Sequence, residues 1–503
     1  MVTSTVRGMN YIGGRWVDAR AETFEDRSPS NITELLGLFP RSGGEEVHAA
    51  VEAARQAFRS WRQESRIGRA EYLDTFVQLV RKDQEELARL ISRECGKHIS
   101  EARADVVEGI HTAQYWFGRA RTPTGEVLAS EIPEKESYVH RKPKGVVAAI
   151  TPWNFPFAIP LWLICPSIVE GNTVVFKPAE ETPLTGQRIM KYFEKAGLPP
   201  GVLNLIQGYG EETGWPLVTH PDVDVVLFTG SAQVGSMIKQ ACAKDYRKFC
   251  VCEMGGKNAM IVFDDADFDL AVNAAVMSAF RTSGQRCVSA ERLIVQEGIS
   301  HRFAEAFVDL ARRIRVGDPL DERTFMGPLV SQAGVEKFEH YNKLAVEEGA
   351  QVHLAGERLL EGGYSRGYFV RPFVYTMRHD PKARVLREEV FGPHVALIPF
   401  KDLDEAVRIY NDCEYGFALS VCSRDYRLIR AVREQCEFGV GYVNLPTIGA
   451  EVHLPFGGLK KSGTGMPSAS ALLDAVTHRI SWTVNHGQEI KMAQGLSAKI
   501  EAE

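Results

Sequence analysis

The stretch GVVAAITPWNFPFAIPLWLICPSIVEGNTVVFKPAE, residues 145–180, decides the fold of this 503-residue chain. It holds two short apolar runs, 145–150 and 172–177, on either side of an apolar segment that three prolines interrupt. Similar runs follow at 202–207, 223–230 and 249–256, with helical patterns between several of them. Strands that are nearly all apolar and are joined by helices form parallel sheets covered on both faces. The sequence therefore predicts an α/β fold.

Outward from this stretch, the patterns indicate two lobes and two exposed strands. Residues 45–118 place apolar side chains at three- and four-residue steps, as helices do. After residue 256 strands and helices alternate again, which marks a second α/β lobe from about 255 to 460. Segments 137–144 and the last 30 residues alternate like exposed strands, and such strands seek partners. We expect them to form an interface sheet.

Composition excludes several classes of protein. The chain has 59 basic and 65 acidic residues and a net charge of −6, so it lacks the excess of positive charge that is typical of nucleic-acid-binding proteins. The most apolar stretch is too short and too interrupted by proline to span a bilayer, so no membrane partner is expected. Nine scattered cysteines and the lack of an apolar leader suit a cytoplasmic protein. No metal site is expected, because Cys250-x-Cys252 has no second pair of ligands.

Cys287 is the first candidate for chemistry. It follows Ser-Gly-Gln-Arg (283–286) on a turn, where backbone amides can be free. A thiol beside free amides and the cation of Arg286 is poised toward the thiolate. The alternative is an inert thiol in the core, which is the more common state of a single cysteine.

Glu253 and Asn154 are candidates for a general base and an oxyanion donor. Glu253 ends a strand and precedes Gly255 and Gly256, where α/β enzymes place their sites. Partial burial would raise the pKa of its carboxyl and make it a usable base. Asn154 lies on a proline-fixed loop and can offer a fixed amide donor. The alternatives are an ion pair between Glu253 and Lys257, and a purely structural turn at Asn154.

Two further motifs favour a nucleotide cofactor. Gly230-Ser231 and Gly235 stand where a strand leads into a helix, and this arrangement permits close approach of a pyrophosphate. The spacing matches neither common phosphate-binding motif, so alone it is a weak signal. Lys177 and Glu180 end another strand, where a carboxylate suits a ribose diol and repels a 2′-phosphate.

Together these motifs resemble the aldehyde dehydrogenase superfamily along nearly the whole chain. The matching segments are TPWNFP (151–156), KPAE (177–180), FTGSAQVG (228–235), EMGGKN (253–258), GQRC (284–287), EEVFGP (388–393) and PFGGLKKSG (455–463). The resemblance implies a Rossmann-like NAD-binding domain (1–121 and 145–254) and a catalytic domain (255–460). It also implies a small β oligomerisation or bridging element (122–144 and 461–503) in a homodimer or homotetramer.

The resemblance also implies a role for each matching residue. Cys287 would form a thiohemiacetal and then a thioester, Asn154 and the Cys287 amide would hold the oxyanion, and Glu253 would activate water. The cofactor would be NAD, with NADP possible but weaker. The residues implied to contact it are Thr151, Pro152, Trp153, Lys177, Glu180, Gly230, Ser231, Gly235, Gly255, Glu389 and Phe391.

The small-molecule substrate is an aldehyde, and the loop 444–456 lies where this superfamily holds the aldehyde's tail. Its PTIGAE motif resembles the α-aminoadipic semialdehyde dehydrogenases, and segments around 145–290 resemble glutamate-semialdehyde (pyrroline-5-carboxylate) dehydrogenases equally well. Both groups oxidise semialdehydes that carry a carboxylate. His453 and Leu454 depart from both patterns. The implied substrate contacts are Arg286, Thr447, Gly449, Ala450 and Phe456.

Three alternatives stand beside a semialdehyde dehydrogenase. One is a dehydrogenase of broad specificity for aliphatic and aromatic aldehydes. Another is a cysteine-dependent esterase or acyltransferase, which would have no need of the cofactor motifs. A non-catalytic structural protein on the same scaffold is disfavoured by the intact nucleophile and base. Arg286 has its own alternative, an outward-facing side chain paired with a neighbouring acid.

Overall fold

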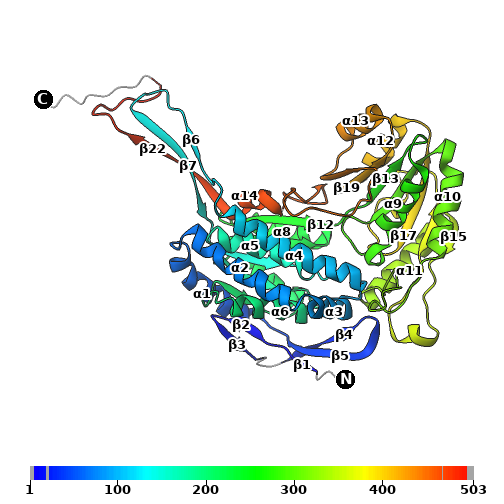
Figure 1. Cartoon of the computed structure of the whole chain (residues 1–503), viewed down its shortest axis with the longest axis horizontal. Helices are drawn as coiled ribbons and strands as arrows, with labels where there is room; N and C mark the ends of the chain where they lie inside the picture. Colours follow the sequence, from blue (N-terminus) through cyan, green and yellow to red (C-terminus); the bar gives the residue numbers. More distant parts are fainter. Residues whose placement is uncertain (1–4, 19–21, 467, 495–503) are drawn as a thin grey trace.

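The computed structural model describes residues 5–18, 22–466 and 468–494, which form two α/β lobes and a projecting β arm (Figure 1). In Figure 1 the second lobe lies on the right, and the arm extends to the upper left, away from both lobes. Within the described ranges, no helix is long and apolar enough to cross a membrane.

The first lobe is built on a seven-stranded sheet with the order β12-β11-β8-β9-β10-β2-β3. The strands from β12 to β10 are parallel, and β2 joins β10 in the antiparallel sense. Every residue of β8, β9 and β10 is buried, which confirms the predicted sheet covered on both faces. The bounds are β2 (Asn10–Ile12), β3 (Arg15–Val17), β8 (Val146–Ile150), β9 (Thr173–Lys177), β10 (Leu203–Leu205), β11 (Val225–Gly230) and β12 (Phe249–Met254).

Helices cover both faces of this sheet. The helical pattern predicted over 45–118 is confirmed as four consecutive helices, and the apolar segment after residue 155 forms α5, in which all 12 residues are buried. The bounds are α1 (Gly44–Trp61), α2 (Arg66–Lys82), α3 (Gln84–Cys95), α4 (Ile99–Arg119), α5 (Ala158–Val169), α6 (Pro183–Lys195), the π-helix η1 (Gly210–Gly214), α7 (Trp215–Thr219) and α8 (Ala232–Cys242).

A small N-terminal sheet, β1-β5-β4, has no counterpart among the elements expected from sequence. Its strands are β1 (Val6–Arg7), β4 (Thr23–Ser28) and β5 (Asn31–Pro40). In β4 the buried positions are Phe24, Asp26 and Ser28, so two of the three are polar. Because the buried face is polar, the strand lacks the alternation of apolar residues that predicts strands.

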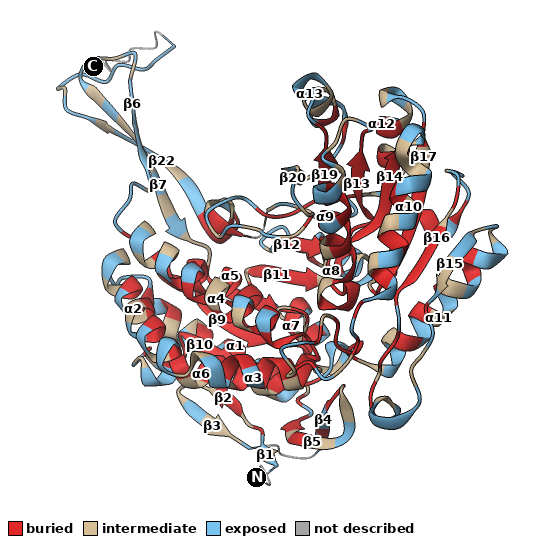
Figure 2. Cartoon of the chain, turned by 45° about the vertical axis from the view of Figure 1, so that its right-hand side comes forward, coloured by how far each residue is buried: buried red, intermediate tan, exposed pale blue. Residues whose placement is uncertain are grey.

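The second lobe holds a seven-stranded sheet with the order β15-β16-β17-β14-β13-β19-β20, as predicted for an α/β unit. Only β15 is antiparallel to its neighbour. Figure 2 shows the strands of both sheets buried and the outer helix faces exposed. The strands are β13 (Asn258–Val262), β14 (Ala290–Gln296), β15 (Gln351–Ala355), β16 (Phe373–Thr376), β17 (His394–Phe400), β19 (Ala418–Cys422) and β20 (Val440–Val443). The helices are α9 (Phe268–Phe280), α10 (Glu297–Arg312), α11 (Gln332–Glu347), α12 (Leu403–Asn411) and α13 (Tyr426–Gln435), with the 3₁₀ turns η2 (Arg281–Gly284), η3 (Gly362–Arg366) and η4 (Arg384–Leu386).

After the second lobe the chain returns to the first. A short ladder, β18 (Tyr415–Gly416) with β21 (Leu459–Lys460), precedes a segment that runs along the free edge of β12. Met254 donates its N–H to the Ser462 carbonyl at 2.8 Å, and Thr464 donates to the Cys252 carbonyl at 2.9 Å. This segment covers the end of the strand that carries Glu253.

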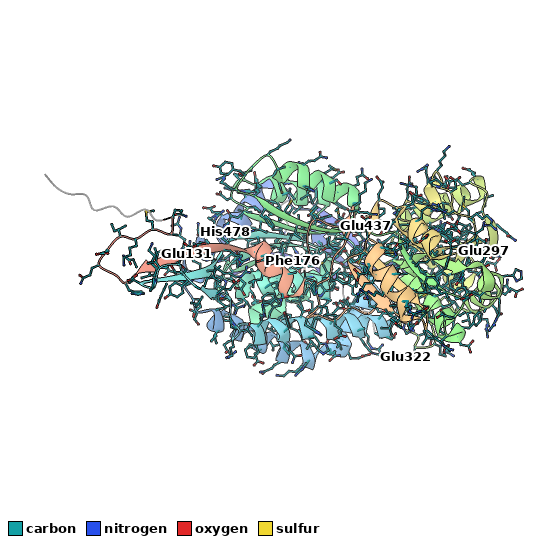
Figure 3. All side chains as sticks on the ribbon, turned by 90° about the horizontal axis from the view of Figure 1, so that it is seen from above. Glu131, Phe176, Glu297, Glu322, Glu437 and His478 are labelled. Carbon is teal, nitrogen blue, oxygen red and sulfur yellow. The ribbon has the colours of Figure 1, made fainter. Side chains whose placement is uncertain are left out.

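The arm is a three-stranded antiparallel sheet with the order β22-β7-β6. The strands are β6 (Glu126–Leu128), β7 (Lys135–Pro143) and β22 (Thr477–Asn485); η5 (Ala469–Ala471) and α14 (Leu472–Val476) lead into it. Thr477 lies opposite Pro143 and Asn485 opposite Lys135. Both segments predicted as exposed strands are confirmed, and they pair with each other. Figure 3 shows the arm, with Glu131 and His478, at the end opposite Glu297 of the second lobe.

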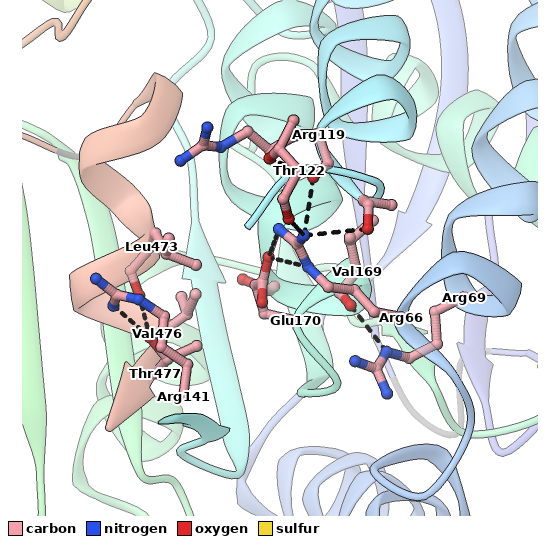
Figure 4. A network of polar contacts seen from close by, with 12 residues as sticks. Arg66, Arg69, Arg119, Thr122, Arg141, Val169, Glu170, Leu473, Val476 and Thr477 are labelled. Atoms are coloured by element: carbon pink, nitrogen blue, oxygen red, sulfur yellow. Dashed lines mark hydrogen bonds and ion pairs between the residues drawn. The ribbon is translucent and has the colours of Figure 1, made fainter. Parts of the chain in front are cut away.

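Figure 4 shows two groups of arginine contacts, one at helix ends of the first lobe and one between the strands of the arm. Arg66 of α2 contacts the Glu170 carboxylate at 2.5 Å and donates to the Arg119 carbonyl at 2.8 Å. Arg69 donates to the Val169 carbonyl at 2.8 Å, and Arg141 of β7 donates to the Thr477 hydroxyl at 2.9 Å. The carbonyls at the C-terminal ends of α4 and α5, those of Arg119 and Val169, therefore accept hydrogen bonds from arginine side chains.

Candidate active site

Cys287 lies on a strained turn between α9 and β14. Thr282, Ser283 and Gly284 have φ angles of 53°, 56° and 71°, a left-handed run that is costly for the two residues with a Cβ. A side chain at Gly284 would run into the Gly392 carbonyl, so the turn packs directly on the segment 388–393. Such strain persists where the surroundings fix it, and it is typical of functional sites.

Buried amide side chains hold this turn in place. The Gln285 side-chain oxygen accepts the Val330 N–H at 3.0 Å, and its amide donates to carbonyls on both sides. Asn258 donates through Nδ2 to the Cys287 carbonyl at 2.6 Å and to the Ser289 carbonyl at 2.9 Å. The backbone around the thiol is therefore fixed by groups from three separate segments.

The expectation that Cys287 is poised toward the thiolate is wrong for this state of the protein. Burial, the nearby Glu253 carboxyl and Glu389 raise the pKa of the Cys287 thiol well above its ordinary value. Arg286 lowers that pKa only weakly, because its guanidinium turns to the Glu101 carboxylate at 2.7 Å. The thiol therefore needs a base to lose its proton.

Glu253 is that neighbouring base. It ends β12 and is 1% exposed, and burial raises the pKa of its carboxyl to about 8. The Cys287 thiol and the Thr229 hydroxyl face the carboxyl and oppose this rise. Neither oxygen of Glu253 has a protein partner at full hydrogen-bond geometry among the described residues. A buried carboxyl without such a partner is costly, and it can accept a proton from a thiol or from water.

Asn154 lies on the loop after β8 and is 3% exposed. Its Nδ2 donates to the Gln285 carbonyl at 3.1 Å, which orients the amide toward the nucleophile turn. Asn154 and Cys287 line the same cavity, so the structure brings all three predicted catalytic residues together. An amide N–H fixed beside a reacting carbonyl is the arrangement that stabilises an oxyanion.

The first cavity has a volume of about 190 Å³ and lies at the carboxyl ends of the parallel strands of the first lobe. Ligands of open α/β sheets bind at this edge. The predicted residues that line it are Pro152, Trp153, Asn154, Gly230, Ser231, Glu253, Gly255, Cys287, Glu389 and Phe391. Thr151, Lys177, Glu180 and Gly235 do not line it and lie at neighbouring strand and helix ends.

These residues fit a nicotinamide dinucleotide. The strand ends offer bare backbone at Gly230, and Ser231 begins α8 with its own side chain accepting the Val234 N–H. A side chain at Gly255 would run into the Glu389 carboxyl, so only glycine leaves the cavity open there. The Lys177 ammonium lies 3.0 Å from the Glu180 carboxylate, a cation and an acceptor suited to a ribose diol.

Glu389 and Phe391 form the wall that faces the first lobe. Glu389 accepts the Gly256 N–H at 2.9 Å, and burial raises the pKa of its carboxyl to about 7. Phe391 has a φ of 61° and meets the Trp153 ring edge-on at 5.6 Å. Lys337 of α11 also lines the cavity, and sequence reasoning missed it because nothing local distinguishes it from a surface lysine.

A second cavity, of about 400 Å³, reaches Cys287 from the other side. It shares Cys287 and Ile159 with the first cavity, so the thiol stands where the two meet. The predicted substrate residues that line it are Arg286, Gly449, Ala450 and Phe456; α4 contributes Ala104, Val107, Glu108 and His111. An aldehyde tail in the second cavity and a nicotinamide in the first would both reach the sulfur.

The structure revises two of the predicted substrate contacts. Thr447 lines neither cavity; it is fully buried, and its hydroxyl donates to the Val288 carbonyl at 2.7 Å, which anchors the loop 444–456. Arg286 lines the second cavity, and its guanidinium lies 5.0 Å from the Phe155 ring. The alternative prediction for Arg286 is an outward-facing side chain paired with an acid. Arg286 does pair with an acid, Glu101, but the pair is largely buried and does not face outward.

Sequence reasoning missed two acids of α4: Glu108, which lines this cavity, and Glu101, which does not line it but pairs with Arg286. Burial raises the pKa of the Glu108 carboxyl to about 8, against the opposing effect of Arg286. The spacing of Glu101, Asp105 and Glu108 could have revealed them, because it places three acids along one face of a helix among apolar neighbours. Acidic residues on a predicted core-facing helix need partners: Asp105 has Lys97 nearby in the sequence, whereas the partner of Glu101 is Arg286, 185 residues away.

Two α/β lobes, with a thiol and a carboxyl at the nucleotide edge of a Rossmann-like sheet, are typical of dehydrogenases that act through a covalent intermediate. A family model described as the aldehyde dehydrogenase family matches residues 16–481. The chain is similar to the α-ketoglutaric semialdehyde dehydrogenase of Bacillus subtilis, with 37% identity over 92% of this chain and 95% of that protein. It is also 37% identical to the 3-sulfolactaldehyde dehydrogenase of Pseudomonas putida, over 92% of this chain and 94% of that protein.

Solved structures agree with these sequence comparisons. The betaine aldehyde dehydrogenase of Staphylococcus aureus in complex with NAD⁺ superposes with a TM-score of 0.93 at 33% identity, covering 98% of each chain. The present chain belongs to the aldehyde dehydrogenase family and is an NAD-dependent aldehyde dehydrogenase.

Proposed function

We propose that this enzyme oxidises an aldehyde that carries a distal carboxylate or similar anion, such as aminoadipic or glutamic semialdehyde, to the corresponding acid. The observation that carries the proposal is the second cavity, which is lined by both Arg286 and Cys287. An arginine can bind a carboxylate through two parallel hydrogen bonds. The two curated relatives act on α-ketoglutaric semialdehyde and 3-sulfolactaldehyde, which are also anionic aldehydes.

The catalytic steps follow from the residues at the junction of the cavities. Glu253 accepts the Cys287 thiol proton, and the sulfur bonds to the aldehyde carbon. The former carbonyl oxygen becomes an oxyanion held by the Asn154 amide and the Cys287 N–H. Glu389, Phe391 and the other residues of the first cavity would hold NAD, which would supply the acceptor for the hydride that this carbon loses. Cys287 then carries a thioester, and Glu253 releases its first proton to solvent. Glu253 next removes a proton from the attacking water, the C–S bond breaks, the acid leaves, and Glu253 returns the proton to the Cys287 thiolate.

Substitution of Arg286 tests the substrate class. Adipic semialdehyde and hexanal have equal chain length and differ in the terminal carboxylate. We expect Arg286→Ala to raise the KM for adipic semialdehyde by about thirtyfold, or 2 kcal/mol, because a charge-assisted bond is lost, and to change that for hexanal little. Arg281→Ala is the matched control, since Arg281 stacks on Phe325 outside both cavities. Equal losses with both aldehydes would refute the anionic substrate.

The cofactor preference rests on Glu180. Its carboxylate suits the ribose 2′-hydroxyl, and it would meet a 2′-phosphate as a like charge at a partly buried position. We expect NAD to be preferred over NADP by at least about tenfold in kcat/KM, or 1.4 kcal/mol, and Glu180→Gln to reduce that preference. Equal efficiency of the two cofactors in the unaltered enzyme would refute this role.

The arm and the free thiols support two further parts of the proposal. The arm exposes Val127 and Trp482 on an isolated three-stranded sheet, and such a sheet gains stability by packing on another chain. We propose a homodimer or homotetramer that the arm helps to assemble, and we assign residues 122–144 and 461–503 to that element, of which residues 467 and 495–503 lie outside the described residues. All nine cysteines are free, which suits the reducing cytoplasm that a catalytic thiol needs.

A further inference from the structure

Glu291 is a buried carboxylate that lies outside both cavities. It is the second residue of β14 and is 3% exposed. Its two oxygens accept the Val390 N–H at 3.0 Å, and Oε1 also accepts the Phe391 N–H at 2.9 Å. One side chain thus satisfies two consecutive backbone donors of the segment that carries Glu389 and Phe391.

Lys257 supplies the opposite charge to Glu291. Its Nζ lies 2.5 Å from Glu291 Oε2, and the side chains are 0% and 3% exposed. A buried ion pair rarely adds net stability, because removing two charges from water costs several kcal/mol per ion. Lys257 follows Glu253 by four residues, so the pair also joins the segment that bears the general base to the segment 388–393.

The segment that Glu291 holds has a conformation that needs support. Phe391 has a φ of 61°, and a left-handed conformation is unfavourable for a residue with a large side chain. The neighbouring Gly392 packs against the strained turn at Gly284, and Glu389 accepts the Gly256 N–H at 2.9 Å. The position of this cavity wall therefore depends on hydrogen bonds that fix its backbone.

We propose that Glu291 is a positioning residue for the cofactor: by accepting the Val390 and Phe391 N–H groups it holds Phe391 in the left-handed conformation and sets the nicotinamide side of the first cavity, with Lys257 as its counter-charge. The inference rests on the proposed assignment of Glu389 and Phe391 as cofactor contacts. Glu291 touches neither cavity, so it acts through the backbone of these two residues.

Two charge-matched double variants separate this role from simple charge balance. Lys257→Met/Glu291→Gln removes both charges but keeps an oxygen that can accept the two N–H groups. Lys257→Met/Glu291→Leu removes the charges and the acceptor. We expect the Leu variant to have a KM for NAD at least about tenfold above that of the Gln variant, with a smaller change in kcat, since cofactor binding loses more than chemistry.

Two readouts exclude a general structural defect. Binding of AMP, which lacks the nicotinamide and its ribose, should be equal in the two variants. Hydrolysis of p-nitrophenyl acetate at Cys287 needs no cofactor, so its rate should also be equal. Glu414→Gln breaks an exposed ion pair with Lys461 at 2.6 Å and serves as the surface control, with no change in any readout.

Several outcomes would overturn the inference. Equal KM values for NAD in the two double variants, or equal weakening of NAD and AMP binding in the Leu variant, would show that Glu291 does not position this wall. If the Leu variant does not fold, the Gln variant decides alone: its KM for NAD must stay within about threefold of the unaltered enzyme. Glu389→Gln and Phe391→Ala test the underlying assignment, because unchanged NAD binding in both would refute the cofactor site itself.

Discussion

At the scale of single residues, the site depends on carboxyls whose burial keeps them protonated near neutral pH. Burial raises the pKa values of both Glu253 and Glu108 to about 8. One faces the thiol and the other lies in the cavity proposed for the aldehyde's tail. The two carboxyls have similar pKa values but different expected effects. Deprotonation of Glu253 should raise kcat, and deprotonation of Glu108 should raise the KM for an anionic aldehyde, so the pH dependence of each quantity tests one residue.

The first prediction concerns Glu253 as a base. Since its pKa is raised, the basic form is a minority at pH 7 and grows as the pH passes 8. We expect kcat to rise between pH 7 and 9, and Glu253→Gln to lose this rise together with about 10²-fold or more of kcat. Rapid-mixing kinetics should show a burst of reduced cofactor followed by slow turnover in the variant. Because Glu253 also accepts the thiol proton, this burst should be slower than in the unaltered enzyme; a burst of unchanged rate would limit the role of Glu253 to hydrolysis of the thioester.

The second prediction concerns Glu108 and an anionic substrate. Below pH 8 its carboxyl is neutral and tolerates a carboxylate tail; above pH 8 it becomes negative and opposes the attraction of Arg286. We expect the KM for adipic semialdehyde to rise by about fivefold between pH 7 and 9, while that for hexanal stays constant. Glu108→Gln should abolish the difference. A parallel pH dependence for both aldehydes would contradict this role.

At the scale of elements, a buried acidic pair joins the N-terminal sheet to the helices of the first lobe. Asp26 of β4 is 2% exposed and interacts with Glu94 of α3. Glu94 accepts the Leu184 N–H at 2.6 Å and the Thr185 N–H at 2.9 Å, two free donors at the start of α6. Burial raises the pKa of Glu94 to about 7 and raises that of Asp26 well above its ordinary value.

This pair predicts a pH-dependent stability. In the unfolded chain Glu94 titrates near 4.5, whereas in the folded protein it keeps its proton to about pH 7. Because the folded state binds more protons, the free energy of unfolding should fall as the pH rises from 4.5 to above 7. We expect Asp26→Asn, which removes one of the two charges, to stabilise the protein at pH 8 by about 1–2 kcal/mol and to change little at pH 5.

Thermal unfolding at pH 5, 6, 7 and 8 checks this prediction. Thr33→Ala is a suitable control, because Thr33 is exposed and its hydroxyl donates to the Asn31 side chain of the same N-terminal sheet at 2.7 Å. A Tm that does not change between pH 5 and 8, or an Asp26→Asn variant with the slope of the unaltered enzyme, would contradict the shared burial of the two acids.

At the scale of the whole molecule, the arm is the one part of the described chain that extends away from both lobes (Figure 1). Val127 is 77% exposed and Trp482 is 59% exposed, which is unusual for large apolar side chains in a folded sheet. Both cavities are lined by residues of the two lobes and lie away from the arm. An assembly formed through the arm, as proposed, would therefore be separable from the chemistry.

The last prediction follows from this separation. We expect the unaltered enzyme to run as a dimer or tetramer in size-exclusion chromatography with light scattering, and Val127→Glu/Trp482→Glu to shift it to a smaller species. Leu360→Glu, at an exposed apolar residue of the second lobe, should not shift it. An unchanged assembly in the arm variant would remove the arm from the interface.

The sequence by itself determined the local features of this protein. Apolar runs and helical periodicity identified the parallel sheets, the helices over 45–118 and the strands of the arm. The order of motifs selected Cys287, Glu253 and Asn154, which the structure brings together in the first cavity, with Cys287 also lining the second. These features are predictable because periodicity and turn chemistry depend on neighbours along the chain.

Only the tertiary structure decided which charges meet and how deeply they are buried. Arg286 pairs with Glu101, 185 residues away, so it lowers the Cys287 pKa only weakly, and burial and Glu253 raise that pKa instead. Glu291 accepts a hydrogen bond from the Phe391 N–H, 100 residues later in the sequence. The strand β4 buries Asp26, so its sequence lacks the apolar alternation that would have predicted a strand. Electrostatic effects depend on distance in space and on exclusion of water, and neither is written in the spacing of residues along the chain.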